Sequence, residues 1–135
     1  MRFLDTRAMN LLEQSLAASG LKHRAISSNL ANINTPGYKA VRVDFYDRFQ
    51  GALADRQGMA LARTSTRHMG AQGPVQIQPR LYRDQSSSMR NDGNNVDVDA
   101  EMVQLAQNQI HYQALLRQAS DRINLLSTVI NEGGR

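Results

Sequence analysis

The stretch SSNLANINTPGYKA, residues 27–40, interrupts an apolar helical pattern and decides where the chain turns. A proline disfavours helical geometry in the residue before it, so the N-terminal helix should end by Asn34. The tetrapeptide TPGY, residues 35–38, fits a type II β-turn, in which Pro36 supplies the fixed φ of the second position and Gly37 the positive φ of the third. We therefore predict that the chain reverses or kinks here.

Three asparagines, Asn29, Asn32 and Asn34, stand at the end of this predicted helix. A side-chain amide both donates and accepts hydrogen bonds, so these residues can pair with the backbone groups that a helix end leaves free. They can equally bond to a neighbouring chain. The residues by themselves leave both interpretations open.

A second, longer helix is predicted over residues 98–131, because apolar side chains recur there at alternating spacings of three and four. At 1.5 Å per residue it would be roughly 50 Å long. Asp97 and Asp99 are candidate N-caps for this helix, and Glu101 adds favourable charge to its first turn. The seam consists of Met102, Leu105, Gln109, Tyr112, Leu116, Ala119, Ile123, Leu126 and Ile130.

A matching seam with the same alternating spacing runs along the N-terminal helix. Asp5 is the expected N-cap of that helix, and Leu4 and Met9 stand at the positions of a hydrophobic staple around it. The seam consists of Met9, Leu12, Leu16, Ser19, His23, Ile26, Leu30 and Ile33.

Two long amphipathic helices at opposite ends of one chain favour an antiparallel hairpin. The heptad pattern does not decide whether helices pair within one chain or between chains. The C-terminal helix has a wider apolar surface than one seam requires, so we expect neighbours to cover a second flank. This flank consists of Val103, Ala106, Ile110 and Leu115.

The predicted fold class is therefore mainly α, with long N- and C-terminal helices pairing as a coiled-coil hairpin. A loop-rich insert between them should carry a few short β-strands, since Val75, Ile77 and Leu81 alternate with polar residues. We expect four segments: an N-terminal coiled-coil helix (1–34), a turn and connecting segment (35–49), the loop-rich insert (50–95) and a C-terminal coiled-coil helix (96–135).

The residue content argues against a catalytic, metal-binding or membrane-spanning protein. The chain has no cysteine, which excludes disulfides, thiolate zinc sites and cysteine nucleophiles. His23, His68 and His111 form no metal-binding motif, and the acidic residues after Gly93 do not fit a calcium loop. No apolar run reaches the roughly 18 residues of a membrane span, and Asp5 interrupts any N-terminal secretory signal. We predict no enzyme activity, no cofactor and no metal.

Charge is unevenly distributed along the chain. Residues 1–90 hold 13 basic and 6 acidic side chains, a net charge of +7, whereas residues 91–135 hold 3 and 6, a net charge of −3. The arginines are scattered and aromatic residues for base stacking are few, which argues against nucleic-acid binding. We expect instead that the basic part of one copy meets the acidic part of the next, around Asp97, Asp99 and Glu101.

Two segments, SSNLANINTPGYKA (27–40) and DGNNVDVDAEMVQLAQNQIHYQALL (92–116), resemble the signature of the bacterial flagellar rod, hook and hook-associated axial proteins. Asn95 stands where that family often has threonine, and Ile33 where it often has alanine. The N-terminal match comprises Asn29, Leu30, Ala31, Asn32, Asn34, Thr35, Pro36, Gly37 and Tyr38. The C-terminal match comprises Asp92, Gly93, Asn94, Val96, Asp97 and Asp99.

The resemblance implies a structural protein of the proximal rod, without catalysis. Its terminal helices would pair as a coiled coil in the inner wall of a helical tube that transmits torque between the membrane ring and the hook. The implied partners are other copies of the chain, the rod proteins FlgC, FlgF and FlgG, FliE, and the MS-ring and export-gate proteins. The implied location is the periplasmic rod of the basal body, reached through the flagellar type III system without a cleavable signal.

Two alternatives stay open beside this expectation. The neighbouring rod protein FlgC is an alternative within the same family. A soluble, non-flagellar adaptor that presents a helical hairpin to one partner is an alternative of a different class. A discrete stoichiometric complex would support the adaptor, whereas open-ended filaments would support the rod protein.

Overall fold

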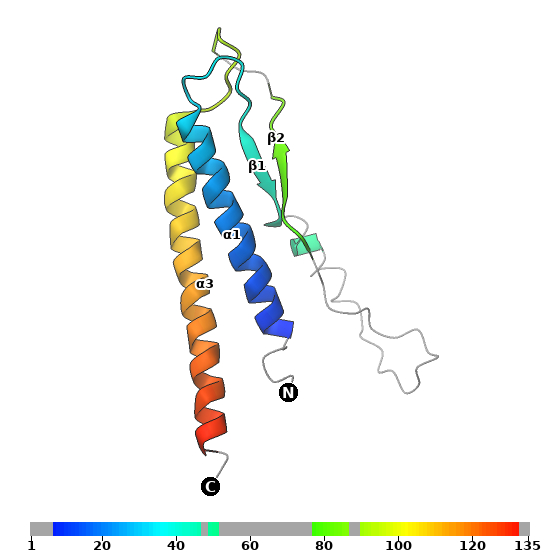
Figure 1. The fold of residues 1–135 in the computed structure, drawn as a ribbon, viewed down its shortest axis with the longest axis vertical. Coiled ribbons are helices and arrows are strands. Elements are labelled where there is room, and N and C mark those ends of the chain that lie inside the picture. Colours follow the sequence, from blue (N-terminus) through cyan, green and yellow to red (C-terminus); the bar gives the residue numbers. More distant parts are fainter. Residues whose placement is uncertain (1–6, 47–48, 52–76, 87–89, 133–135) are drawn as a thin grey trace, which may run out of the picture.

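The computed structural model describes residues 7–46, 49–51, 77–86 and 90–132. In chain order its elements are helix α1 (Arg7–Ala31), strands β1 (Val41–Asp44) and β2 (Arg80–Arg83), and helix α3 (Val98–Glu132) (Figure 1). The mainly helical fold class predicted from the sequence is confirmed. The predicted cap Asp5, the staple residue Leu4, the strand residue Val75 and His68 lie outside the described residues.

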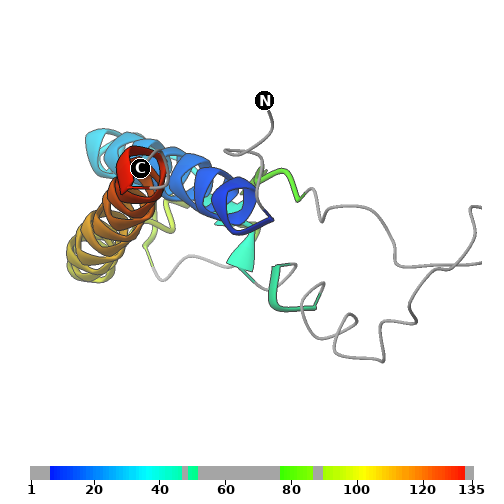
Figure 2. The same ribbon diagram turned by 90° about the horizontal axis from the view of Figure 1, so that it is seen from below.

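The two helices run antiparallel and in contact (Figures 1 and 2). Asn29, near the end of α1, bonds to Glu101 in the first turns of α3, while Ser19, further back on α1, bonds to Asn108. Increasing residue numbers on one helix therefore meet decreasing numbers on the other. At 35 residues α3 is longer than α1, which has 25, so the C-terminal end of α3 extends past the described start of α1.

Strands β1 and β2 form a two-stranded antiparallel sheet, called the hairpin from here on. In it Val41 pairs with Arg83 and Asp44 with Arg80. The predicted strand around Leu81 is present as β2, but its partner β1 lies in the connecting segment, where no strand was predicted. Two paired strands are marginally stable by themselves, so the hairpin depends on packing against the helices.

A small apolar core fixes the hairpin on α1. Ala18 of α1, Phe45 after β1 and Ile77 before β2 are buried together, with Val43 packed against them. The side chain of Ala18 is small, which lets Phe45 approach the helix closely. Two further aromatic rings, Tyr46 and Phe49, contact Phe45 at centroid distances of 5.4 and 5.3 Å.

The contact line between α1 and α3 is rotated from the seam predicted on α3. Glu101 and Asn108 are buried against α1, whereas the seam member Met102 is half exposed. On a helix with apolar residues around most of its circumference, several rows of apolar side chains have alternating spacings of three and four. The sequence pattern therefore does not show which row contacts the other helix. Among the predicted seam residues, Leu105, Ala119 and Leu126 are half-buried, and Tyr112, Leu116, Ile123 and Ile130 are exposed.

The seam predicted on α1 is also only partly the observed one. Leu12, Ser19 and Ile26 are buried, while Leu16 and Leu30 are half-buried and His23 is exposed. The hairpin covers part of the α1 circumference, so the buried face of this helix is shared between two neighbours. Small and polar residues such as Ala18 and Asn29 occupy the part that faces the hairpin.

Candidate functional site

The TPGY turn and the C-terminal signature meet at one end of the helix pair. The backbone N–H of Tyr38 donates to the carbonyl of Thr35 at 3.3 Å, and Gly37 has φ of 70°, which confirms its predicted positive φ. The N–H of Gly37 donates to the carbonyl of Asp92 at 2.8 Å. Gly93, with φ of 76°, lies so near that an added Cβ would stand 3.7 Å from the Cα of Gly37.

Replacing Gly37 with valine should destabilise this contact. A β-branched residue resists a φ of 70°, and such backbone strain costs on the order of 1 to 3 kcal/mol. Urea unfolding followed by circular dichroism measures the loss. Gly51→Val is the control, because a Cβ added to Gly51 would meet no atom within 4 Å and Gly51 has no positive φ. Equal stability of the two variants would contradict the strain at Gly37.

Asn94 satisfies the carbonyl groups that the end of α1 leaves free. This side chain is fully buried, and its Nδ2 donates to the carbonyls of Asn32, Ile33 and Thr35 at 3.0, 2.9 and 3.0 Å. Its Oδ1 accepts from the N–H of Val96 at 2.8 Å, which fixes the chain as it approaches α3. A residue of the C-terminal signature thus pairs with the free carbonyl groups at the end of α1, where the N-terminal signature lies.

Asn29 pairs with β1 as a strand would. Its Nδ2 donates to the carbonyl of Val41 at 3.0 Å, and its Oδ1 accepts from the N–H of the same residue at 2.8 Å. The hydroxyl of Tyr38 also donates to Oδ1 at 3.3 Å, and Nδ2 donates to Glu101 Oε2 at 3.2 Å. This fully buried amide therefore joins α1, the turn, β1 and α3.

Glu101 is fully buried and bound to Arg42 of β1. The guanidinium Nη1 lies 2.7 Å from Glu101 Oε1, and Arg42 Nε lies 3.8 Å from Asp84. Glu101 was expected to add charge to the first turn of α3, where it stands, and to meet the basic part of another copy. The second expectation is wrong, because contacts with β1 and α1 of the same chain enclose the carboxylate.

Asp97 is the N-cap of α3. Its Oδ1 accepts from the N–H groups of Asp99 and Ala100 at 3.0 and 3.4 Å, and its carbonyl accepts from the N–H of Glu101 at 2.9 Å. Asp99 lies exposed in the first turn, where its charge favours the positive end of the helix dipole.

Asn95 ties the hairpin to the same region. Its Oδ1 accepts from the N–H of Ala40 at 2.7 Å, and its Nδ2 donates to the carbonyl of Asp84 at 2.9 Å. A threonine, which the resemblance would place here, lacks a side-chain amide and cannot form this pair of bonds in the same way. We define the helix-end joint by Asn29, Arg42, Asn94, Asn95 and Glu101 together with the glycines Gly37 and Gly93.

The remaining matched residues lie around this joint. Asn32 donates to the carbonyl of Ser28 at 2.8 Å and accepts from the hydroxyl of Thr35 at 3.3 Å. Val96 is buried. Leu30 is half-buried, and Ala31, Asn34 and Pro36 are exposed. The helix-end asparagines Asn29 and Asn32 thus bond within the chain, whereas Asn34 faces outward.

Charges of opposite sign are also paired beside the joint. The N–H of Asn94 donates to Asp92, which lowers the pKa of this carboxyl, and Arg90 lowers it further. The Asp92 carboxylate also lies 2.9 Å from Arg90 Nη2. Hydrogen bonds from Ser86 lower the pKa of Asp84, beside Arg42. Part of the acidic C-terminal charge is therefore matched by basic residues of the same chain, which weakens the expectation that it serves contacts between copies.

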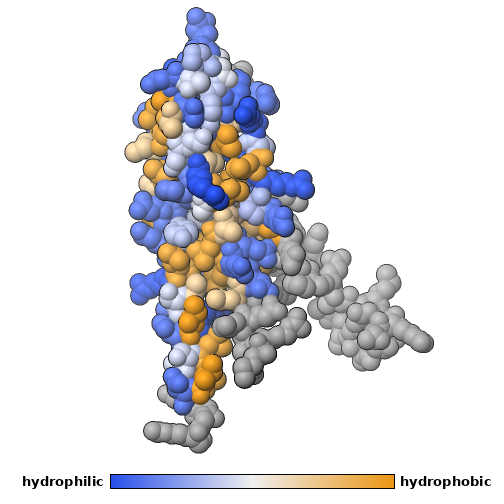
Figure 3. Space-filling view, viewed as in Figure 1, coloured by the Kyte–Doolittle hydropathy of each residue, from blue (hydrophilic) through white to orange (hydrophobic). Residues whose placement is uncertain are grey.

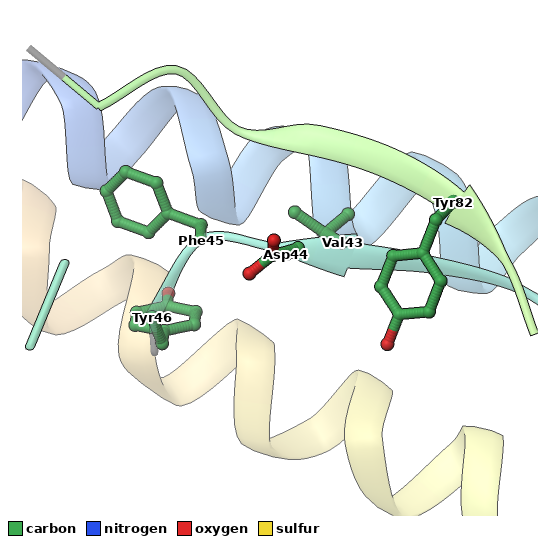
Figure 4. Close-up of a pocket in the computed structure, with 5 residues that line it drawn as sticks. All are labelled: Val43, Asp44, Phe45, Tyr46 and Tyr82. Carbon is green, nitrogen blue, oxygen red and sulfur yellow. The ribbon is translucent and has the colours of Figure 1, made fainter. Parts of the chain in front are cut away.

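A hollow of about 540 Å³ lies beside the hairpin (Figure 4). Val43, Asp44, Phe45, Tyr46 and Tyr82 line it, with one carboxylate and two phenols. Burial raises the pKa of Tyr46, whose hydroxyl lies 3.1 Å from His111 Nδ1. Across the described ranges, no three histidine or acidic side chains are grouped as metal ligands would be, and neither helix has the length and apolarity needed to cross a membrane.

Comparison with known proteins finds a matching family and several relatives that are similar over most of the chain. Residues 9–39 match the family described as flagella basal body rod protein. The flagellar basal body rod protein FlgB of Bacillus subtilis (strain 168) is 38% identical over 124 residues, which cover 90% of this chain and 92% of the relative. FlgB of Yersinia ruckeri is 32% identical, with 93% and 95% covered, and FlgB of Escherichia coli (strain K12) is 31% identical, with 93% and 94% covered.

Proposed function

Because the chain belongs to the FlgB family of flagellar basal body rod proteins, we propose that it is a structural subunit of the proximal rod. In this role it assembles helically and forms part of the drive shaft and of the export channel wall, between the membrane ring and the hook. It acts by packing and has no catalytic activity.

The observation that carries this proposal is the large uncovered apolar surface of α3, part of which is visible toward the lower end of this helix in Figure 3. Ile110 and Ile130 are 70% and 69% exposed, and Val103, Leu125 and Val129 are more than half exposed. A single chain that leaves so many large apolar side chains in water gains free energy when neighbours cover them. Subunits of a tube have neighbours on several sides, which suits a helix that is apolar around most of its circumference.

The proposed partners are other copies of the chain, the rod proteins FlgC, FlgF and FlgG, FliE, and the MS-ring and export-gate proteins. The proposed location is the periplasmic rod of the basal body, with export through the flagellar type III system. The names of the relatives favour a FlgB role over the FlgC alternative. The paired helices and the joint are compatible with the adaptor alternative, which therefore has to be separated by experiment.

The test is complementation of a flagellated host that lacks its own FlgB gene. We expect this chain to restore swimming, and immunogold electron microscopy of purified basal bodies to detect it in the rod. Recovery of the chain in a discrete soluble complex, with no basal bodies formed, would support the adaptor and contradict the rod role.

A further inference from the structure

The described residues leave one face of the helix pair uncovered. The hairpin packs where Ala18 and Asn29 face it, and Gly20 lies two residues after Ala18, about 200° further around α1. On this opposite face a groove of about 520 Å³ runs between α1 and α3, lined by Gly20, His23, Gln109, Tyr112 and Leu116 among others.

Among the residues that the structure describes, none requires a glycine at position 20. It lies inside α1, where glycine costs about 1 kcal/mol relative to alanine. A Cβ added to Gly20 would meet nothing within 4 Å. A helix glycine at the base of an open groove allows close approach of another chain to the backbone, which indicates an occupant from outside.

The outer side of α3 offers a shape that fits such a groove. Val103, Ala106, Ile110 and Ala114 are all exposed and recur at spacings of three, four and four. Ile110, which is 70% exposed, stands between two alanines. A large side chain flanked by small ones can enter the space above a glycine, as a knob enters a hole between packed helices.

We propose that Ile110 of a second copy seats in the groove at Gly20, with Val103, Ala106 and Ala114 along the contact. This inference rests on the proposed rod function and identifies one of its contacts between copies. The contact is heterologous, because the groove and the outer stripe are different surfaces of one molecule. Each added copy therefore presents a new groove and a new stripe, so growth stays open-ended.

Charge supports the second copy as the occupant and fixes its direction. Glu13 lies seven residues before Gly20 on the same face of α1, and Arg117 lies seven residues after Ile110 near the stripe of α3. Both side chains are exposed. When both copies point the same way, α3 of one runs antiparallel to α1 of the other. Arg117 then reaches the level of Glu13, since each lies about 10 Å from the central contact.

Disulfide cross-linking tests the contact directly, because the natural chain has no cysteine. Gly20→Cys and Ile110→Cys chains are expressed together in the complemented host, and the cells are treated with a thiol oxidant. We expect a disulfide-linked dimer that contains one chain of each kind. The control pairs Gly51→Cys with Ile110→Cys, since Gly51 is exposed and lies outside the groove, and should give no such dimer.

Two further variants separate this contact from general damage. In Gly20→Leu the leucine side chain fills the groove, and leucine is a good helix former. We therefore expect normal helix content in the purified chain and loss of swimming. Cells that carry Gly51→Leu should swim. Glu13→Arg and Arg117→Glu should each reduce swimming, and the two together should restore it.

The outcomes distinguish this inference from the function on which it rests. A wild-type chain that never enters basal bodies contradicts the rod role. A wild-type chain that enters them while Gly20→Leu also assembles normally overturns the groove contact alone. A cross-link from Gly20→Cys to a different rod protein, with none to Ile110→Cys, overturns the second copy as the occupant.

Discussion

Replacing Asn94 with alanine should lower the free energy of unfolding by about 2 to 4 kcal/mol. The change removes the donor to three carbonyls at the end of α1 and the acceptor for the N–H of Val96, in a place where the side chain is fully buried. Backbone groups that lose their partners in such surroundings keep the cost of desolvation. Urea unfolding, followed by circular dichroism, measures the difference.

Two companion variants define what this loss means. Asn94→Asp keeps the size but replaces the donor by an acceptor, so it should be destabilised at neutral pH about as much as the alanine variant. Asn34→Ala, on an exposed asparagine of the same region, should change stability by less than about 0.5 kcal/mol. A stable Asn94→Asp protein would show that the three bonds to the α1 carbonyls contribute little.

Replacing Arg42 with methionine should cost about 3 kcal/mol, because it leaves the fully buried Glu101 carboxylate without its cation. The value lies at the low end for a broken buried pair. Asn29 still donates to Glu101, and Arg42 is itself one-quarter exposed. Unfolding in urea at neutral pH measures this cost.

The double variant Arg42→Met with Glu101→Leu is the decisive comparison. Removing both charges leaves no unpaired carboxylate, so the double variant should be more stable than Arg42→Met alone. Arg83→Met, on an exposed arginine of β2, is the matched control and should have little effect. If the double variant is as unstable as the sum of its single changes, the ion pair does not account for the cost.

Assembly should respond to these changes through the joint. Asn29, Asn94 and Glu101 hold the start of α3 against the end of α1, and so set how the outer surface of α3 is presented. A variant that weakens the contacts of the joint can keep both helices folded and still change how their exposed faces are oriented relative to each other. We therefore expect variants of the joint to reduce incorporation into a rod even where helix content is retained.

The sequence by itself determined the features that depend on neighbouring residues. It predicted a helix over residues 98–131, and α3 spans Val98–Glu132. It predicted the end of the N-terminal helix before the proline and a positive φ at Gly37. Helix periodicity, capping and turn geometry depend on side chains within about four positions of one another, so one sequence carries enough information to place them.

Only the tertiary structure decided the partners of the polar residues and the line of contact between the helices. Asn29 binds Glu101, 72 positions away, and Asn94 binds Ile33, 61 positions away. Strand β1 pairs with β2, and residues beside both strands pack on α1. An asparagine amide can pair with almost any peptide group, and a helix apolar on several sides can turn any of them inward. Those choices are made by packing across the whole chain, because spacing along the sequence does not distinguish among them.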